Sequence, residues 1–415
     1  MDTSPILVFL GQAAILIALP DLLWRHTLLR RIAPLVVVQI LIGIALGPSL
    51  LGQAVPALAS VLLQGKGLAA LSGLAWLAVM MFAFLTGLHF DTAEIGGRTT
   101  GFAATALSSI LVPAVLGVAG GMVLFDAAPA LAGTNADRWL FAAGVGVALA
   151  VTALPVLAAI LRETGLLGER IGRDALGLAA VNDLVLWIML AAVVSVTRAD
   201  STTATLMLHI VFAAGYLLLM FFVVRPLARR WLRRLIETQA SGEGELVAVV
   251  ALTLGSAWIT ESLGFHYILG AFIAGAILPP ACAAPLIRQI EPYTVVVLLP
   301  FFFILTGLRI DLRPGGEGFA LAFWIGTAVA VVGKMLGTMV PARLAGANWR
   351  DSWRLGTLMQ CKGLMDVVVL SVLLDAGILA PTAFSALVLM AVVTTAATKP
   401  MLMLIDHSWR QREQP

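Results

Sequence analysis

The stretch ALGLAAVNDLVLWIMLAAVVSV, residues 175–196, is long enough to cross a membrane and carries one charged side chain, Asp183, in its interior. A transmembrane helix needs about 20 predominantly apolar residues to cross a hydrocarbon core of about 30 Å. Similar apolar segments recur along the 415-residue chain, which is 60% hydrophobic and 12% charged. Soluble globular proteins are about 25% charged. The chain is therefore predicted to be an all-α polytopic membrane protein in a lipid bilayer.

These segments predict thirteen transmembrane helices. Cytoplasmic loops are enriched in Lys and Arg. With the N-terminus outside, 18 basic residues fall in the inner loops and the tail, against 5 in the outer loops. This asymmetry predicts an N-terminus outside and a C-terminus inside. We expect the protein to lie in the cell (cytoplasmic) membrane, the inner membrane of a bacterium. The predicted spans are 5–24, 33–52, 67–89, 99–125, 139–161, 172–197, 203–224, 245–262, 264–281, 287–309, 318–342, 353–376 and 382–405.

The longest polar linker, RRWLRRLIETQASGEGE at 229–245, divides the chain into two sets of helices. Many transporters consist of inverted repeats. One span in each half carries a helix-breaking pattern, TALP at 152–155 and CKG at 361–363. We therefore expect inverted repeats with two broken helices. Only DHSWRQREQP follows the last span, at 406–415, so no soluble regulatory domain is expected.

Asp183 is the candidate for chemistry inside the membrane. A carboxylate at the bilayer centre costs about 2.5–3.5 kcal/mol on a translocon-insertion scale. Because removal from water disfavours the charged form, the carboxyl group could hold either a proton or a metal cation, but not both. This competition is a minimal mechanism for exchange. The alternative is a structural Asp183 whose oxygens are satisfied by helix caps or hydroxyl groups.

Asn182, the neighbour of Asp183, can donate and accept hydrogen bonds but cannot carry a second proton. If Asp183 is the one titrating group, one proton should exchange for one monovalent cation. Asn182 could instead cap broken backbone, and the two roles are compatible.

Thr152 and Pro155 lie in the middle of the fifth span. Proline removes a backbone donor and clashes with the preceding turn, which frees upstream carbonyl groups. Irregular backbone is tolerated at membrane depth only where it is buried in protein or lines a cavity. The Thr152 hydroxyl and the freed carbonyls are hard oxygen ligands that suit an alkali cation. The alternative is an ordinary proline kink.

Three further charged residues lie inside predicted spans. Lys362 precedes Gly363, which predicts the second helix break, and Asp366 lies four residues beyond Lys362 on the same helical face. The two could satisfy only each other. Lys334, in the eleventh span, could balance the charge of Asp183, or it could extend its side chain to the interface.

Several other functional classes lack a signature in this sequence. The chain contains no HExxH, GxSxG or Walker motif, so it is not expected to be an enzyme. Most of its basic residues are distributed over the predicted membrane loops and do not form one basic patch, which argues against binding of nucleic acid. Cys282 and Cys361 offer neither a disulfide framework nor a metal-binding spacing. No cofactor is expected beyond the transported ions.

Over nearly its whole length the chain resembles the monovalent cation:proton antiporter-2 family (Kef/CHX-like) of the sodium/proton exchanger superfamily. The Asn-Asp pair and the Lys-Gly break are most similar to the plant CHX exchangers and their bacterial relatives. The motifs that carry the resemblance are IAPLVVVQILIGIALGPSLLG at 32–52, FAFLTGLHFD at 82–91, TALPVLAAILRETGLLGERIGRDALGLAAVNDL at 152–184, HYILGAFIAGAILP at 266–279, PFFFILTGLRIDL at 300–312 and CKGLMDVVVL at 361–370.

The resemblance implies a homodimer of thirteen-helix protomers. Residues 99–197 and 318–405 would form a core with two broken helices that cross near the ion, and residues 1–98 and 203–312 a dimer scaffold. An elevator-like motion of the core would give alternating access, with Asp183 as the ion-binding carboxylate.

Asn182 occupies the position at which electrogenic members carry a second aspartate. In those members that aspartate pairs with the lysine that corresponds to Lys334, so the partner of Lys334 in this chain stays open. Leu178 stands where the sister family of electroneutral sodium exchangers often carries Glu. The glutathione-gated members carry a nucleotide-binding domain, and no such domain is expected here.

Antiport of K⁺ or Na⁺ against H⁺ is the leading hypothesis. A sodium-coupled symporter of an organic anion would need two sodium sites and a polar cavity for the solute, and few such residues are present. A membrane sensor without transport activity would leave Asp183 replaceable. The sequence does not choose between K⁺ and Na⁺, because oxygen ligands serve both ions and selectivity depends on cavity size and field strength.

Overall fold

The computed structural model describes residues 5–26, 35–47, 50–54, 66–89, 100–166, 169–198, 211–212, 214–230, 242–263, 266–310 and 318–413. These residues are almost entirely helical, and the only β-type pairing among them is an isolated bridge between Ala132 and Leu379. The predicted all-α class is confirmed. Eight of the described helices are long and apolar enough to cross a membrane. The number of spans and the orientation stay predictions.

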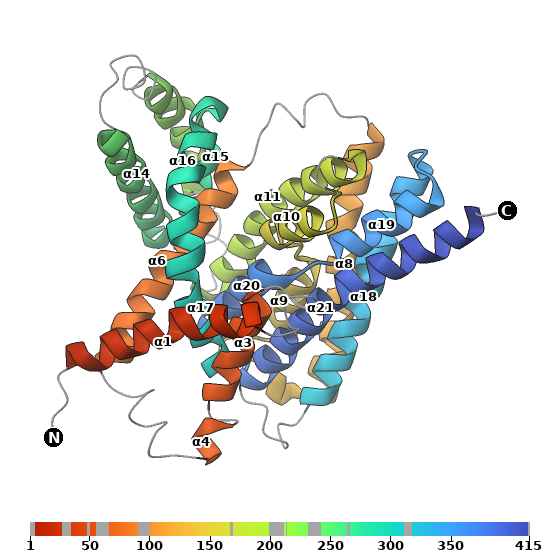
Figure 1. Ribbon diagram of the computed structural model, residues 1–415, viewed down its shortest axis with the longest axis horizontal. Helices are drawn as coiled ribbons and strands as arrows, with labels where there is room; N and C mark the ends of the chain where they lie inside the picture. Colours follow the sequence, from red (N-terminus) through yellow and green to blue (C-terminus); the bar gives the residue numbers. More distant parts are fainter. Residues whose placement is uncertain are drawn as a thin grey trace. The chain divides into compact units, whose positions relative to one another are not determined.

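The described helices follow the predicted spans closely along the chain (Figure 1). The first six spans correspond to α1 (Pro5–His26), α3 (Leu35–Leu46) with α4 (Leu51–Ala54), α6 (Lys66–Leu88), α8 (Thr100–Ala127), α9 (Arg138–Ala150) with α10 (Leu154–Glu163), and α11 (Arg170–Arg198). A short 3-10 helix, η1 (Pro129–Leu131), lies between α8 and α9.

The second half follows the same correspondence. The seventh span lies partly outside the described residues, and its described part is helical over 214–230, with a π-helical segment η2 (Leu219–Val224). The later helices are α14 (Gly242–Ser262), α15 (Tyr267–Ala276), α16 (Pro280–Tyr293) with the π-helical η3 (Thr294–Leu298) and α17 (Leu299–Leu308), α18 (Phe319–Leu344), α19 (Trp349–Met359), α20 (Gly363–Asp375) and α21 (Pro381–Glu413).

The chain divides into two compact units. Unit 1 comprises residues 1–69, 94–190 and 303–415, and unit 2 comprises residues 70–93 and 191–302. In unit 1, α8 contacts α9 and α18, and α18 also contacts α19 and α21 (Figure 1). Unit 1 holds all the polar residues singled out above as candidates: Thr152, Asn182, Asp183, Lys334, Lys362 and Asp366. The predicted division into core and dimer scaffold stays a prediction.

Two related motifs end helices in the two halves of the chain, FLTGLHFD at 84–91 and ILTGLRID at 304–311. A Cβ atom on Gly87 of α6 would collide with the backbone carbonyl of Phe272 on α15. Likewise, a Cβ atom on Gly307 of α17 would collide with the carbonyl of Ile40 on α3. Each motif therefore lets a helix of one half approach the backbone of a helix from the other half, as expected for a repeated structure.

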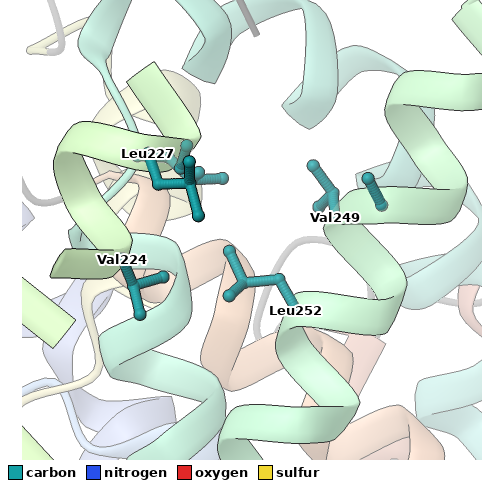
Figure 2. A pocket seen from close by; sticks show the side chains of 7 residues that line it. Val224, Leu227, Val249 and Leu252 are labelled. Atoms are coloured by element: carbon teal, nitrogen blue, oxygen red, sulfur yellow. The ribbon is translucent and has the colours of Figure 1, made fainter. Parts of the chain in front are cut away.

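Unit 2 contains an apolar pocket of about 300 Å³. Figure 2 shows Val224 and Leu227 on one side of it, opposite Val249 and Leu252 of α14. The seven lining residues are Val224, Leu227, Ala228, Ala248, Val249, Leu252 and Leu278. Because these side chains are all aliphatic, the pocket offers no side-chain ligand for a cation.

We predict that Gly307→Val destabilises the fold, because the new side chain must displace the backbone of α3. Overpacking of this kind costs about 1–3 kcal/mol. The melting temperature of detergent-solubilised protein, followed by size-exclusion chromatography after heating, should fall clearly. Gly73→Val on α6 is the control, since no atom lies within 4 Å of a Cβ built there. Equal melting temperatures for the two variants would contradict the close contact.

Candidate functional site

Two helices of unit 1 are interrupted in mid-span, and both interruptions fall where the sequence predicts them. α9 ends at Ala150 and α10 begins at Leu154, while α19 ends at Met359 and α20 begins at Gly363. Gly363 has a φ of +55°, which residues with a Cβ atom rarely adopt. Each break leaves backbone groups of the adjoining helix ends without intrahelical partners.

Pro155 has a different position from the one expected. It was predicted to interrupt a helix and free the carbonyls before it, but it occupies the second position of α10, within that helix's first turn. A proline there removes no hydrogen bond, because the first N–H groups of a helix have no intrahelical acceptor. Pro155 thus belongs to the start of the second helix, and the irregular residues are 151–153.

The two breaks hydrogen-bond to each other. The Thr152 hydroxyl donates to the carbonyl of Met359 at 2.8 Å, and the Ala153 N–H donates to the carbonyl of Cys361 at 2.8 Å. The Gly363 N–H donates to the Thr395 hydroxyl on α21, also at 2.8 Å. The prediction that the broken helices cross is therefore confirmed, and the crossing satisfies polar groups that the breaks expose.

Lys362 caps the end of α9 from the other broken helix. Its Nζ donates to the carbonyls of Ala148 and Leu149 at 3.2 and 3.1 Å, and it lies 3.5 Å from Oδ1 of Asp366. The Lys362 and Asp366 side chains are both fully buried. The alternative that these two residues satisfy only each other is wrong, because the ammonium group also neutralises the carbonyl end of α9.

Asp183 lies in α11 and is 1% exposed. Neither of its carboxylate oxygens has a hydrogen-bond partner among the described residues. The helix caps and hydroxyl groups invoked by the structural alternative are therefore not found around it. A buried ionised carboxylate without hydrogen bonds is strongly disfavoured. Asp183 is thus a buried acid whose oxygens are free to accept a ligand.

Lys334 is fully buried on α18, so it does not extend to the interface. Its Nζ donates to the carbonyl of Ser109 on α8 at 3.0 Å. The Asn182 amide is best satisfied when its Oδ1 accepts from Lys334 at 3.2 Å and its Nδ2 donates to the carbonyl of Ala106 at 3.1 Å. Lys334 therefore has the neutral Asn182 and a backbone carbonyl as partners, and Asn182 bonds to an intact helix rather than to a break.

Ser109 was missed by the sequence analysis. Its hydroxyl lies 3.1 Å from the Asn182 amide, and its carbonyl accepts from Lys334. The available signal was the Ser-Ser pair at 108–109 in the middle of an apolar span. Thr152, by contrast, was identified, but its hydrogen bond joins it to Met359, and Asp183 makes no hydrogen bond to it.

Four buried ionisable residues interact electrostatically in this region. The charge of Lys334 interacts with those of Asp183, Lys362 and Asp366. Two acids and two bases sum to zero when all are ionised. Binding either one proton or one monovalent cation at Asp183 changes this sum by the same single charge. A proton and a monovalent cation bound at Asp183 would therefore have the same effect on the net charge of this group.

Comparison with known proteins gives a consistent picture. A profile for the family described as "Sodium/hydrogen exchanger, transmembrane" matches residues 13–404. Cation/H(+) antiporter 18 of Arabidopsis thaliana is 36% identical, over 92% of this chain and 47% of its own length. K(+)/H(+) antiporter 1 of Saccharomyces cerevisiae is 30% identical, over 97% of this chain and 47% of its own length. The chain thus spans about half the length of these relatives.

A relative of similar length and a solved structure extend the comparison. Na(+)/H(+) antiporter NhaS4 of Synechocystis is 32% identical, over 98% of both chains. The solved sodium proton antiporter MjNhaP1 from Methanocaldococcus jannaschii has the same fold, with a TM-score of 0.62 at 12% identity. The match covers 97% of this chain and 99% of that one.

We predict that Lys362→Met destabilises the protein more than Asp366→Asn does. Removing one partner of a buried ion pair costs about 3–5 kcal/mol. The lysine variant also leaves two carbonyls of α9 without their donor, whereas the aspartate variant keeps that cap. Melting temperatures of the single and double variants would measure this difference. A larger effect of Asp366→Asn would show that the cap contributes little.

Proposed function

Because the chain belongs to the sodium/hydrogen exchanger family, we propose that it is a secondary antiporter in which one monovalent cation, K⁺ or Na⁺, and one proton compete for Asp183. The observation that carries this proposal is the buried Asp183 carboxylate, whose two oxygens have no hydrogen-bond partner among the described residues. The cation and the proton would each neutralise the Asp183 carboxylate in turn. Neither would bind while the other is bound, and this exclusion couples cation transport to proton transport.

An electroneutral exchange follows from the neighbours of Asp183. Asn182 cannot ionise, and Lys334 is held by a backbone carbonyl and the Asn182 amide. A single titrating carboxylate exchanges one charge for one equal charge. The Thr152 hydroxyl donates its hydrogen bond to the carbonyl of Met359, so its oxygen lone pairs would be available to a cation near the crossing. No resident cofactor is needed in this scheme.

The protein is a multi-pass membrane protein. We place it in the inner membrane of a bacterium, as a homodimer in which the core moves by an elevator-like displacement. The names of the relatives support antiport over symport with an organic anion or a sensor role, since they are called cation/H⁺, K⁺/H⁺ and Na⁺/H⁺ antiporters. Because those names include both cations, the choice between K⁺ and Na⁺ belongs to experiment.

The first test uses purified protein in proteoliposomes with a lumenal pH dye. External K⁺, Na⁺ or Li⁺, but not choline, should drive protons across the membrane, and clamping the membrane potential should leave the rate unchanged. Lowering the pH should raise the apparent KM for the cation, by about tenfold per unit where the proton predominates. Asp183→Asn should abolish the signal, because an amide holds neither ion.

Asp21→Asn is the matched control, since Asp21 is an exposed residue paired with Arg25 on α1. It should transport like the wild type. Full activity of Asp183→Asn, or proton movement with none of the alkali cations, would overturn the proposal.

A second prediction concerns stoichiometry. Asn182→Asp would place a second carboxylate within reach of Lys334, where the amide oxygen now accepts its hydrogen bond. If Lys334 and the new carboxylate change partners during the cycle, the exchange should carry net charge. Its rate should then respond to an imposed membrane potential, unlike that of the wild type. A variant that transports without any response to potential would show that Asn182 does not set the stoichiometry.

A further inference from the structure

The apolar pocket of unit 2 lies where three helix ends meet. Its lining residues come from the C-terminal end of the helix at 214–230, from the N-terminal half of α14, and from Leu278 just beyond α15. The charge pattern of the loops predicts that all three of these helix ends face the cytoplasm. The pocket is therefore expected at the level of the cytoplasmic leaflet, close to the lipid headgroups. The antiport cycle proposed above does not use it.

This pocket is suited to an apolar occupant and not to water. Its lining side chains are all aliphatic, and Figure 2 shows Val224 and Leu227 facing Val249 and Leu252 across it. A buried water needs two to four polar partners, and an apolar protein cavity of about 150 Å³ stays dry and binds an apolar ligand. Leu227 is 63% exposed, so the wall of the pocket reaches the protein surface. In a membrane, the apolar group available at that surface is a lipid acyl chain.

Three arginines, Arg225, Arg229 and Arg230, accompany the pocket-lining residues of the helix at 214–230. Arg225 and Arg229 lie four residues apart and share one helical face, next to the face that carries Val224 and Ala228. In the described part of the chain, no carboxylate forms an ion pair with any of the three arginines. A group of unpaired positive charges thus lies directly beside the apolar pocket.

The guanidinium group of Arg225 has unused hydrogen-bond donors. Its Cζ lies 5.8 Å from the centroid of the Phe221 ring, and its buried Nε has no hydrogen-bond partner among the described residues. A cation–π contact uses the charge of the guanidinium and leaves its N–H donors free. Because buried polar groups are normally paired, these donors indicate an acceptor from outside the described protein. Phosphate oxygens match the planar fork of a guanidinium especially well.

We propose that this end of unit 2 binds one phospholipid with an anionic headgroup, whose acyl chain fills the pocket and whose phosphate accepts hydrogen bonds from Arg225 and Arg229. Basic pockets at the cytoplasmic ends of transmembrane helices suit such headgroups. Three arginines at 225–230 exceed the two acidic residues at the start of α14, Glu243 and Glu245, so the net charge favours an anion. A free phosphate would leave the aliphatic pocket unfilled, which favours a lipid as the source of the phosphate.

The first test compares two lipids with the same acyl chains. Purified protein in detergent is titrated with phosphatidylglycerol or phosphatidylcholine, and bound lipid is counted by native mass spectrometry. The wild type should bind one phosphatidylglycerol per protomer at least tenfold more tightly than phosphatidylcholine. Arg225→Gln and Arg229→Gln should each weaken phosphatidylglycerol binding by about fivefold, because each removes one positive charge at the headgroup.

Arg25→Gln is the matched control, since Arg25 is an exposed arginine on α1 that is already paired with Asp21. It should bind both lipids like the wild type. Equal affinity of the wild type for the two lipids, or the same loss of phosphatidylglycerol binding in Arg25→Gln as in Arg225→Gln, would show a non-specific lipid shell and overturn the site.

The second test concerns the pocket. Ala248→Phe and Ala228→Phe each place an aromatic ring in it, from opposite helices, so the result does not depend on the folding of one variant. Both should weaken phosphatidylglycerol binding by about tenfold. Glycerol phosphate, which lacks acyl chains, should not compete with the lipid. Unchanged lipid binding in both phenylalanine variants, or effective competition by glycerol phosphate, would overturn the acyl chain as occupant. Because no ion gradient is used, these outcomes are independent of the proposed antiport.

Discussion

The crossing of two interrupted helices is the constraint on which the rest of unit 1 depends. Each interruption exposes backbone groups at a depth where no water can satisfy them, so neither broken helix is tolerable alone. The hydroxyl and N–H groups of residues 152 and 153 bond to carbonyls of the other break. Lys362 from that break caps two carbonyls at the end of α9. The two irregular segments are stable because each supplies the partners that the other lacks.

The crossing of the two broken helices also explains how several charged side chains can be buried inside a membrane, where an unpaired charge is energetically costly. Lys362 serves the α9 carbonyls and Asp366 together, and Lys334 is held by Ser109 and Asn182. Among these buried ionisable groups in the described residues, the Asp183 carboxylate makes neither a hydrogen bond nor a close ion pair. The scaffold thus pairs Asp366 with Lys362 and leaves the Asp183 carboxylate to interact with transported ions.

Local sequence signals predicted the features that depend on local chemistry. The span limits followed from uninterrupted apolar runs, and the break before Gly363 followed from a residue type that accepts a positive φ. Pro155 indicated the right segment but the wrong role, because a proline within a helix and one in its first turn look alike in sequence. Ser109 escaped attention because small hydroxyl residues are frequent in transmembrane helices. Its importance lies in the groups that it contacts on other helices, Asn182 and Lys334.

By itself, the sequence determined that this protein is an all-α membrane protein with an ionisable centre. Hydrophobic length and the cost of burying Asp183, Lys334 and Lys362 are properties of the residues themselves. Only the tertiary structure decided which polar group each charged side chain contacts. Lys362 could have paired with Asp366 alone, and Lys334 could have reached the interface. Contacts between residues more than 200 positions apart settled both questions, because hydrogen bonding in a water-free interior depends on atoms within about 3 Å and not on distance along the chain.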